Sequence, residues 1–158
     1  MASDMFIKID GIAGESNDAK HKDEIEVSDL KWSIEQTSNM HSGSGGGAGK
    51  ATVGDLLFWH QVDRASPNLT KFCLTGNHIA HAKLTVRKAG GSPLEFYKIT
   101  MSDVIVTKVN PISNEEGVFE QVGLSFANVM QEYILQSAQG GSGGVVTAAF
   151  DIKRNVDC

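Results

Sequence analysis

The chain has 158 residues, with 14 Lys and Arg against 19 Asp and Glu, which gives a formal net charge of −5. This length can bury a core without disulfide or metal support, and a composition of 41% hydrophobic and 21% charged residues excludes a wholly disordered or fibrous chain. The cations are scattered and lack the basic stripe that phosphate binding needs, so nucleic-acid binding is not expected.

The N-terminal part of the chain has the pattern of β-strands. Apolar residues alternate at Met5, Ile7 and Ile9, which is the period of a half-buried strand. The alternation resumes over residues 25–35 and changes phase near Ser28, where we expect a bulge. The chain has no basic leader, and its apolar runs are far shorter than the roughly 20 residues that cross a bilayer. We therefore expect neither a cleaved signal peptide nor membrane insertion.

One helix is predicted at about residues 67–75. We expect Ser66 to be its N-cap, Pro67 its first residue and Gly76 the residue that ends it. The helix should pack on the strands through an apolar stripe. The residues of this stripe are Leu69, Phe72, Cys73 and, at its edge, Leu74.

The second half of the chain has the pattern of further strands. They are predicted at residues 78–88, 94–101, 104–109, 118–129, 132–137 and 145–152. A turn at residues 89–93 joins the first two strands as a hairpin. Turn signals at this spacing are typical of a sandwich or barrel, so the fold is predicted to be mainly β.

Two glycine-rich stretches resemble catalytic or binding motifs. Residues 43–51 do not match a phosphate-binding loop, because Ser44 stands where the motif requires Gly and Ala51 where it requires Ser or Thr. Residues 140–144 match the nucleophile-elbow pattern around Ser142. In the hydrolases that use this pattern the catalytic histidine follows the serine along the chain, whereas here every histidine precedes Ser142. A serine hydrolase that uses Ser142 or Ser44 with an upstream histidine remains an alternative.

The histidines and cysteines do not predict a metal site. His78 and His81 are three residues apart, and on a strand they point to opposite faces. Cys73 and Cys158 are expected to be free thiols. No cofactor is expected.

A series of motifs in a fixed order extends over essentially the whole chain. They are DMFIKIDGI at residues 4–12, GES at 14–16, HKDEI at 21–25, GGGAGK at 45–50, ASPNL at 65–69, RKAGG at 87–91, FANV at 126–129 and DIKRN at 151–155. In order and spacing they resemble the hemolysin-coregulated protein family, the tube-forming proteins of bacterial type VI secretion systems.

The resemblance implies a compact β-barrel of two antiparallel sheets flanked by one helix. It implies a single domain over residues 1–158, with a glycine-rich extended loop at about 40–50. Six copies would close into a ring, and rings would stack into a hollow inner tube whose lumen carries or stabilises small effector proteins. Its other partners would be the type VI sheath and spike. The protein would be cytoplasmic before assembly, then secreted or delivered to a target cell, and would not be an enzyme.

Two sets of residues are predicted to serve this assembly. Glycines allow close backbone approach, so the extended loop is expected to contact the next ring. Its residues are Met40, His41, Gly43, Gly45, Gly46, Gly47, Gly49 and Lys50. The second set alternates with the apolar positions of the strand near residue 31 and is predicted to line either the lumen or an outer surface. Its members are Lys31, Ser33 and Glu35.

A third function class stays open beside the tube subunit and the serine hydrolase. A secreted adhesin or host-interaction module would bind cells as the unassembled protein. The tube subunit, by contrast, requires ring formation by the purified chain.

Overall fold

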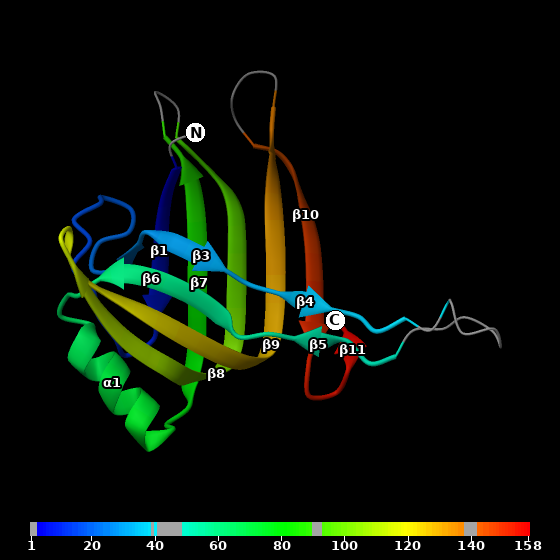
Figure 1. Ribbon diagram of the computed structural model, residues 1–158. Helices are drawn as coiled ribbons and strands as arrows, with labels where there is room; N and C mark the ends of the chain where they lie inside the picture. The colour runs from blue at the N-terminus through cyan, green and yellow to red at the C-terminus, as the bar shows by residue number, and fades with distance from the viewer. Residues whose placement is uncertain (1–2, 39, 41–48, 90–92, 138–141) are drawn as a thin grey trace.

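A computed structural model describes residues 3–38, 40, 49–89, 93–137 and 142–158 (Figure 1). Strands dominate this part of the chain, and one helix is present in it. The elements in order are β1 (Ser3–Ile9), β2 (Ile25–Val27), β3 (Asp29–Lys31), β4 (Ile34–Glu35), β5 (Thr52–Val53), β6 (Leu56–Gln61), α1 (Ser66–Thr75), β7 (Ile79–Lys88), β8 (Leu94–Asn114), β9 (Gly117–Gln136), β10 (Ser142–Asp151) and β11 (Val156–Asp157).

Two long strands connect the layers of the molecule. β8 and β9 pair from Tyr97 with Tyr133 to Asn114 with Gly117. The last part of β9 also pairs with β10, and its first part pairs with β6, which in turn pairs with β3. The first part of β8 continues through β7 and β1 to β2. The sheet therefore folds over on itself, so that β3 and β6 face the layer that contains β7 and β1 (Figure 1).

The phase change near Ser28 is present, but the predicted bulge is wrong, because the chain turns a corner there between two short strands that pair with different partners. β2 pairs with β1, whereas β3 pairs with β6. At the corner, the Ser28 backbone N–H donates to the Trp59 carbonyl oxygen at 2.8 Å. The prediction of a mainly β fold with antiparallel sheets and one helix is confirmed. Since the pairing changes partner at Ser28, however, no continuous ladder closes a barrel.

The prediction of four separate strands between residues 94 and 137 is wrong. They are the two continuous strands β8 and β9. Asp103 has a left-handed backbone conformation with φ of 54°, and the register with β9 shifts between Val106 and Lys108. These irregularities bend the strand and change the phase of its apolar positions, and in the sequence such a change resembles a turn.

The core lies between the folded halves of the sheet. Its side chains come from both layers and from α1, and the largest are completely inaccessible to solvent. They include Ile7, Ile25, Leu56, Phe58, Leu69, Leu84, Ile99, Met101 and Leu124. No helix in the described part of the chain is long and apolar enough to span a membrane. Both cysteines are free thiols, as predicted.

The helix begins one residue earlier than predicted. Ala65, not Ser66, occupies the N-cap position, and no side chain caps the helix. The Ser66 hydroxyl instead accepts a hydrogen bond from the Asp63 N–H at 3.2 Å, and Asp63 accepts one from the Ala65 N–H at 2.8 Å. The C-terminal prediction is confirmed, because Gly76 is left-handed with φ of 66°.

The two leucines of α1 provide a matched test of this packing. Leu69 is buried, whereas Leu74, the edge position of the predicted stripe, is 82% exposed. We expect L69A to lower the free energy of unfolding by about 2–5 kcal/mol, because it removes buried methyl groups and leaves a cavity. We expect L74A to change it by less than about 0.5 kcal/mol. Urea unfolding of both variants, followed by tryptophan fluorescence, measures the difference. Equal losses would contradict this packing.

Candidate assembly surfaces

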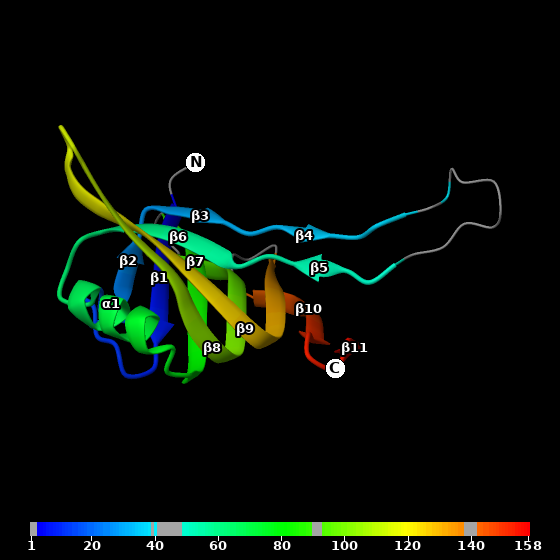
Figure 2. The same ribbon diagram turned by 60° about the horizontal axis from the view of Figure 1, so that its bottom comes forward.

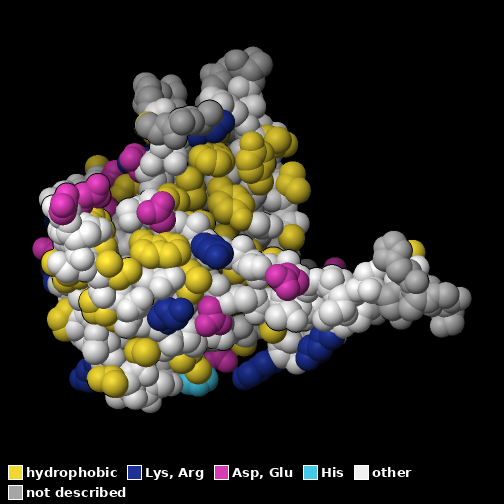
Figure 3. All heavy atoms as spheres, viewed as in Figure 1, with side chains coloured by type: hydrophobic (Ala, Val, Ile, Leu, Met, Phe, Trp, Pro, Cys, Tyr) yellow, Lys and Arg dark blue, Asp and Glu magenta, His cyan; other side chains and the backbone are white. Residues whose placement is uncertain are grey.

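The core face of the sheet extends beyond the layer that covers it. Along β8, the buried side chains of Met101 and Ile99 lead to Tyr97, and the same face continues onto β9 and β10. There Tyr133 is 43%, Leu135 45% and Val146 60% exposed. Figure 3 shows hydrophobic side chains gathered over the upper part of β9 and β10. We call Tyr133, Leu135 and Val146 the apolar surface, a kind of patch that marks interaction sites.

The strand beside the apolar surface has a free edge. β10 pairs with β9 along its whole length, but on its other side only Phe150 and Asp151 pair with β11. Within the described residues, no strand covers the edge of β10 from Val145 to Ala148. Such an edge presents unpaired N–H and C=O groups and favours association with another chain. A groove of 440 Å³ lies beside it, lined by Trp32 and Ile34 among others.

The strands β4 and β5 form a two-stranded ribbon that leaves the body of the molecule (Figure 2). Ile34 pairs with Val53, and beyond the ribbon the Gly49 N–H donates to the Thr37 carbonyl oxygen at 3.2 Å. Of the predicted ring-stacking residues, the structure describes Met40, Gly49 and Lys50, and all three are exposed. The others, His41, Gly43, Gly45, Gly46 and Gly47, lie outside the described residues.

The alternation predicted around residue 31 is present in the structure. Lys31, Ser33 and Glu35 are exposed, whereas Trp32 is half-buried and donates from its indole N–H to the Gly54 carbonyl oxygen at 3.0 Å. Ile34, which the alternation places with Trp32, is 55% exposed. A single subunit has no lumen, so the assignment of the three polar residues to a lumen remains a prediction.

A charged network, which the sequence did not reveal, fixes the segment between β1 and β2. Arg87 of β7 binds Asp18 at 2.9 Å and Asp4 at 3.1 Å. The His21 ring lies between two carboxylates, with Nδ1 2.9 Å from Glu24 and Nε2 2.7 Å from Glu95. These partners are distant in the sequence, so no local pattern indicates them.

The charges of this network shift the pKa values of its carboxyls. The hydrogen bond from Arg87 lowers the pKa of Asp18 from 3.8 to about 2. For Glu95, burial is the largest single effect and acts to raise the pKa, but the hydrogen bond from His21 and the charges of His21, Lys98 and Lys20 together outweigh it, so the pKa is lowered. A carboxyl whose pKa is lower in the folded state stabilises the fold above its ordinary pKa. This stabilisation is lost as the pH falls toward 2.

Removing the Arg87 guanidinium tests this pairing. In R87Q we expect the pKa of Asp18 to return toward 3.8, because its main hydrogen-bond donor is lost. An NMR titration of the Asp18 carboxyl carbon measures the shift. R64Q is the matched control, since Arg64 pairs with Asp23 rather than with Asp18. An Asp18 pKa that stays near 2 in R87Q would contradict the assignment.

The residues considered for chemistry do not assemble into a catalytic or metal site within the described chain. His78 Nδ1 lies 2.5 Å from Asp103 and His81 Nδ1 lies 3.4 Å from Asp10, so the two histidines have separate partners. No cluster of described residues has the ligands for a metal ion. Ser142 begins β10, while Ser44 lies outside the described residues. The hydrogen bonds of the described histidine rings go to carboxylates, from His21 to Glu24 and Glu95, from His60 to Glu120 and from His78 to Asp103.

Comparisons with known proteins agree over the whole chain. A family model described as type VI secretion system effector, Hcp, matches residues 6–133. Protein hcp1 of Pseudomonas aeruginosa is 44% identical, and the match covers 99% of each chain. The crystal structure of Hcp1 from Salmonella typhimurium is 48% identical, covers 100% of both chains and has a TM-score of 0.84. A type VI secretion system effector from Yersinia pestis is 40% identical over 94% of this chain and 99% of its own, with a TM-score of 0.78.

Proposed function

The chain belongs to the hemolysin-coregulated protein (Hcp) family of type VI secretion tube and effector proteins, and from this we propose that six copies close into a ring. We propose further that rings stack into a hollow tube that is exported and that holds small effector proteins in its lumen. The sheath and spike of the secretion system are the proposed partners of the tube. The protein is proposed to be cytoplasmic until it assembles, and export is proposed to need no cleaved signal peptide.

The observation that carries ring closure is the apolar surface beside the free edge of β10. Tyr133, Leu135 and Val146 continue the core face of the sheet, and a neighbouring copy would remove them from water. A ring needs a heterologous contact, in which this surface meets a different surface of the next copy. Pairing along β10 would at the same time protect the edge from uncontrolled association.

The projecting ribbon supports the stacking part of the proposal. β4 and β5 extend away from the folded sheet, so the described residues next to them, 36–38 and 49–51, lie beyond the body of the subunit (Figure 2). Met40 is 69% exposed, so an apolar side chain is available there for contact with another copy. Contact with the next ring would bury it.

The comparisons support neither the serine hydrolase nor the adhesin. The family is one of structural, secreted proteins. The four described histidines each lie beside carboxylates, which accounts for their positions without a serine nucleophile. Catalysis therefore has no part in the proposal.

A charged residue in the apolar surface should prevent ring formation. In L135D we expect a monomer, because a carboxylate would be buried against the neighbouring copy without a partner. L74D on α1 is the control, since it makes the same change at a site that is 82% exposed and lies outside the apolar surface. Light scattering after size-exclusion chromatography and electron microscopy of negatively stained particles give the result. A wild-type chain that is monomeric over a wide concentration range would overturn the proposal, and rings in L135D would exclude this surface.

The lumen assignment can be tested by distances between labels. In a background without Cys73 and Cys158, a spin label at S33C would lie nearer the axis of the ring than one at K71C on α1. We therefore expect electron-spin distance measurements on assembled rings to give shorter distances between neighbouring subunits at position 33. Longer distances at position 33 would place Lys31, Ser33 and Glu35 on the outer surface.

A further inference from the structure

A cleft of about 500 Å³ lies at the end of β1, apart from the apolar surface and the ribbon. One wall is residues 8–13, which end β1 and form the turn after it, and the other is residues 22–24, which precede β2. Backbone hydrogen bonds fix the second wall. The Gly14 N–H donates to the Asp23 carbonyl oxygen at 2.7 Å, and the Asp23 N–H donates to the Ser16 carbonyl oxygen at 2.9 Å. The cleft is therefore already formed in the free chain, as binding sites commonly are.

Two lysines of the cleft have no ionic partner in the described chain. Lys8 and Lys22 are exposed, and no described carboxylate lies within 4.0 Å of either side-chain nitrogen. The three carboxylates of the cleft, in contrast, each have a partner. The pairs are Asp10 with His81 at 3.4 Å, Asp23 with Arg64 at 2.9 Å and Glu24 with His21 at 2.9 Å. The charge that the cleft leaves unpaired is therefore positive.

A third lysine lies beside the cleft on the neighbouring strand. Lys83 of β7 is directly opposite Lys8 in the antiparallel pair with β1, so both side chains leave the same face of the sheet. Lys83 is exposed too, and no described carboxylate lies within 4.0 Å of its side-chain nitrogen. Like charges in directly opposite positions destabilise a sheet. An anionic ligand between the two lysines would replace this repulsion by attraction.

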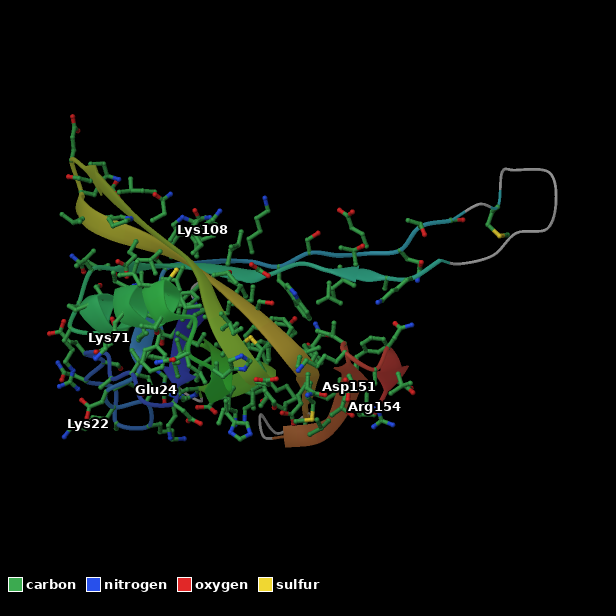
Figure 4. All side chains as sticks on the ribbon, turned by 90° about the horizontal axis from the view of Figure 1, so that it is seen from below. Lys22, Glu24, Lys71, Lys108, Asp151 and Arg154 are labelled. Carbon is green, nitrogen blue, oxygen red and sulfur yellow. The ribbon has the colours of Figure 1, made fainter. Side chains whose placement is uncertain are left out.

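The lysines of β1 and β7 lie on the face of the sheet that is turned away from the core. Ile7 and Ile9 flank Lys8 and are buried in the core, and successive side chains of a strand point to opposite faces. The apolar surface continues the core face, so contact between copies through that surface does not use these lysines. Figure 4 shows Lys22 on the side of the molecule opposite Lys108 of β8. The cleft is therefore separate from the surface proposed for ring closure.

We propose that this cleft binds an acidic segment of a partner protein, whose Asp or Glu side chains pair with Lys8, Lys22 and Lys83. The volume of the cleft exceeds what a single inorganic anion fills, and Ile12 and Ala13 in its wall offer apolar contacts that such an ion does not use. A peptide segment makes both kinds of contact. The inference goes beyond ring and tube formation and does not depend on them, because the whole cleft belongs to one chain.

Binding of a short fluorescent oligoglutamate peptide to the full chain tests the proposal. At low salt we expect binding to the wild type, and binding about tenfold weaker to the triple variant K8Q/K22Q/K83Q, because three charge pairs are lost. The net charge of −5 opposes any general attraction of an acidic peptide, so binding reports a local site. Fluorescence anisotropy measures the affinity.

A second triple variant is the matched control. K31Q/K71Q/K108Q removes the same number of charges from exposed lysines that do not line the cleft, and we expect it to bind the peptide as the wild type does. Circular dichroism verifies that both triple variants are folded. K83Q alone should be at least as stable to urea as the wild type, because it removes the repulsion with Lys8.

The possible outcomes are distinct. A wild-type chain that does not bind oligoglutamate at low salt, or that binds oligoglutamine equally well, would overturn the proposal. Equal losses in the two triple variants would overturn it as well, since the cleft would then not be the site. Tighter binding of inorganic phosphate or of a short oligonucleotide than of oligoglutamate would overturn the assignment to a protein partner. Ring formation should be the same in K8Q/K22Q/K83Q as in the wild type, so a wild-type chain without rings would contradict the proposed function and leave the cleft unaffected.

Discussion

The antiparallel pairing of β8 with β9 is the constraint on which the rest of the molecule depends. The two strands run through both layers, and every other part of the large sheet is attached to one of them. β7 and β1 extend from the first part of β8, β6 from the first part of β9, and β10 from its last part. The left-handed residue Asp103 and the register shift that follows it allow this long pair to bend from one layer into the other.

This bent pair also explains why part of the apolar face of the sheet is uncovered. The layer that contains β10 is longer than the layer of β3 and β6 that covers it, so core-facing side chains such as Leu135 and Val146 remain exposed. Burying them within the monomer would require a longer covering layer. In the proposed ring, a neighbouring copy would provide the same burial and would also cover the edge of β10.

Charged residues fix the segments around this β framework. Arg87 and His21 bind the segment between β1 and β2 to β7 and β8 through four carboxylates, and the Arg87 guanidinium also lies 5.1 Å from the centre of the Phe6 ring. His60 and Glu120 form a buried pair at the end of β6. Breaking such a pair leaves an uncompensated buried charge, so it constrains how β6 and β9 align.

The sequence alone determined the mainly β class, the helix and its glycine C-cap, the irregularity near Ser28 and the family, because each of these depends on local periodicity, on single residues such as Gly76 or on the order of motifs. It did not determine that β8 and β9 are continuous, since a bulge and a turn change the apolar phase in the same way. Nor did it reveal the uncovered apolar surface, because Leu135 has the same alternating pattern whether or not a second layer lies above it. Only the tertiary structure brought His60 to Glu120 and Arg87 to Asp18, because pairs separated by some 60 residues or more along the chain form only when the strands are paired.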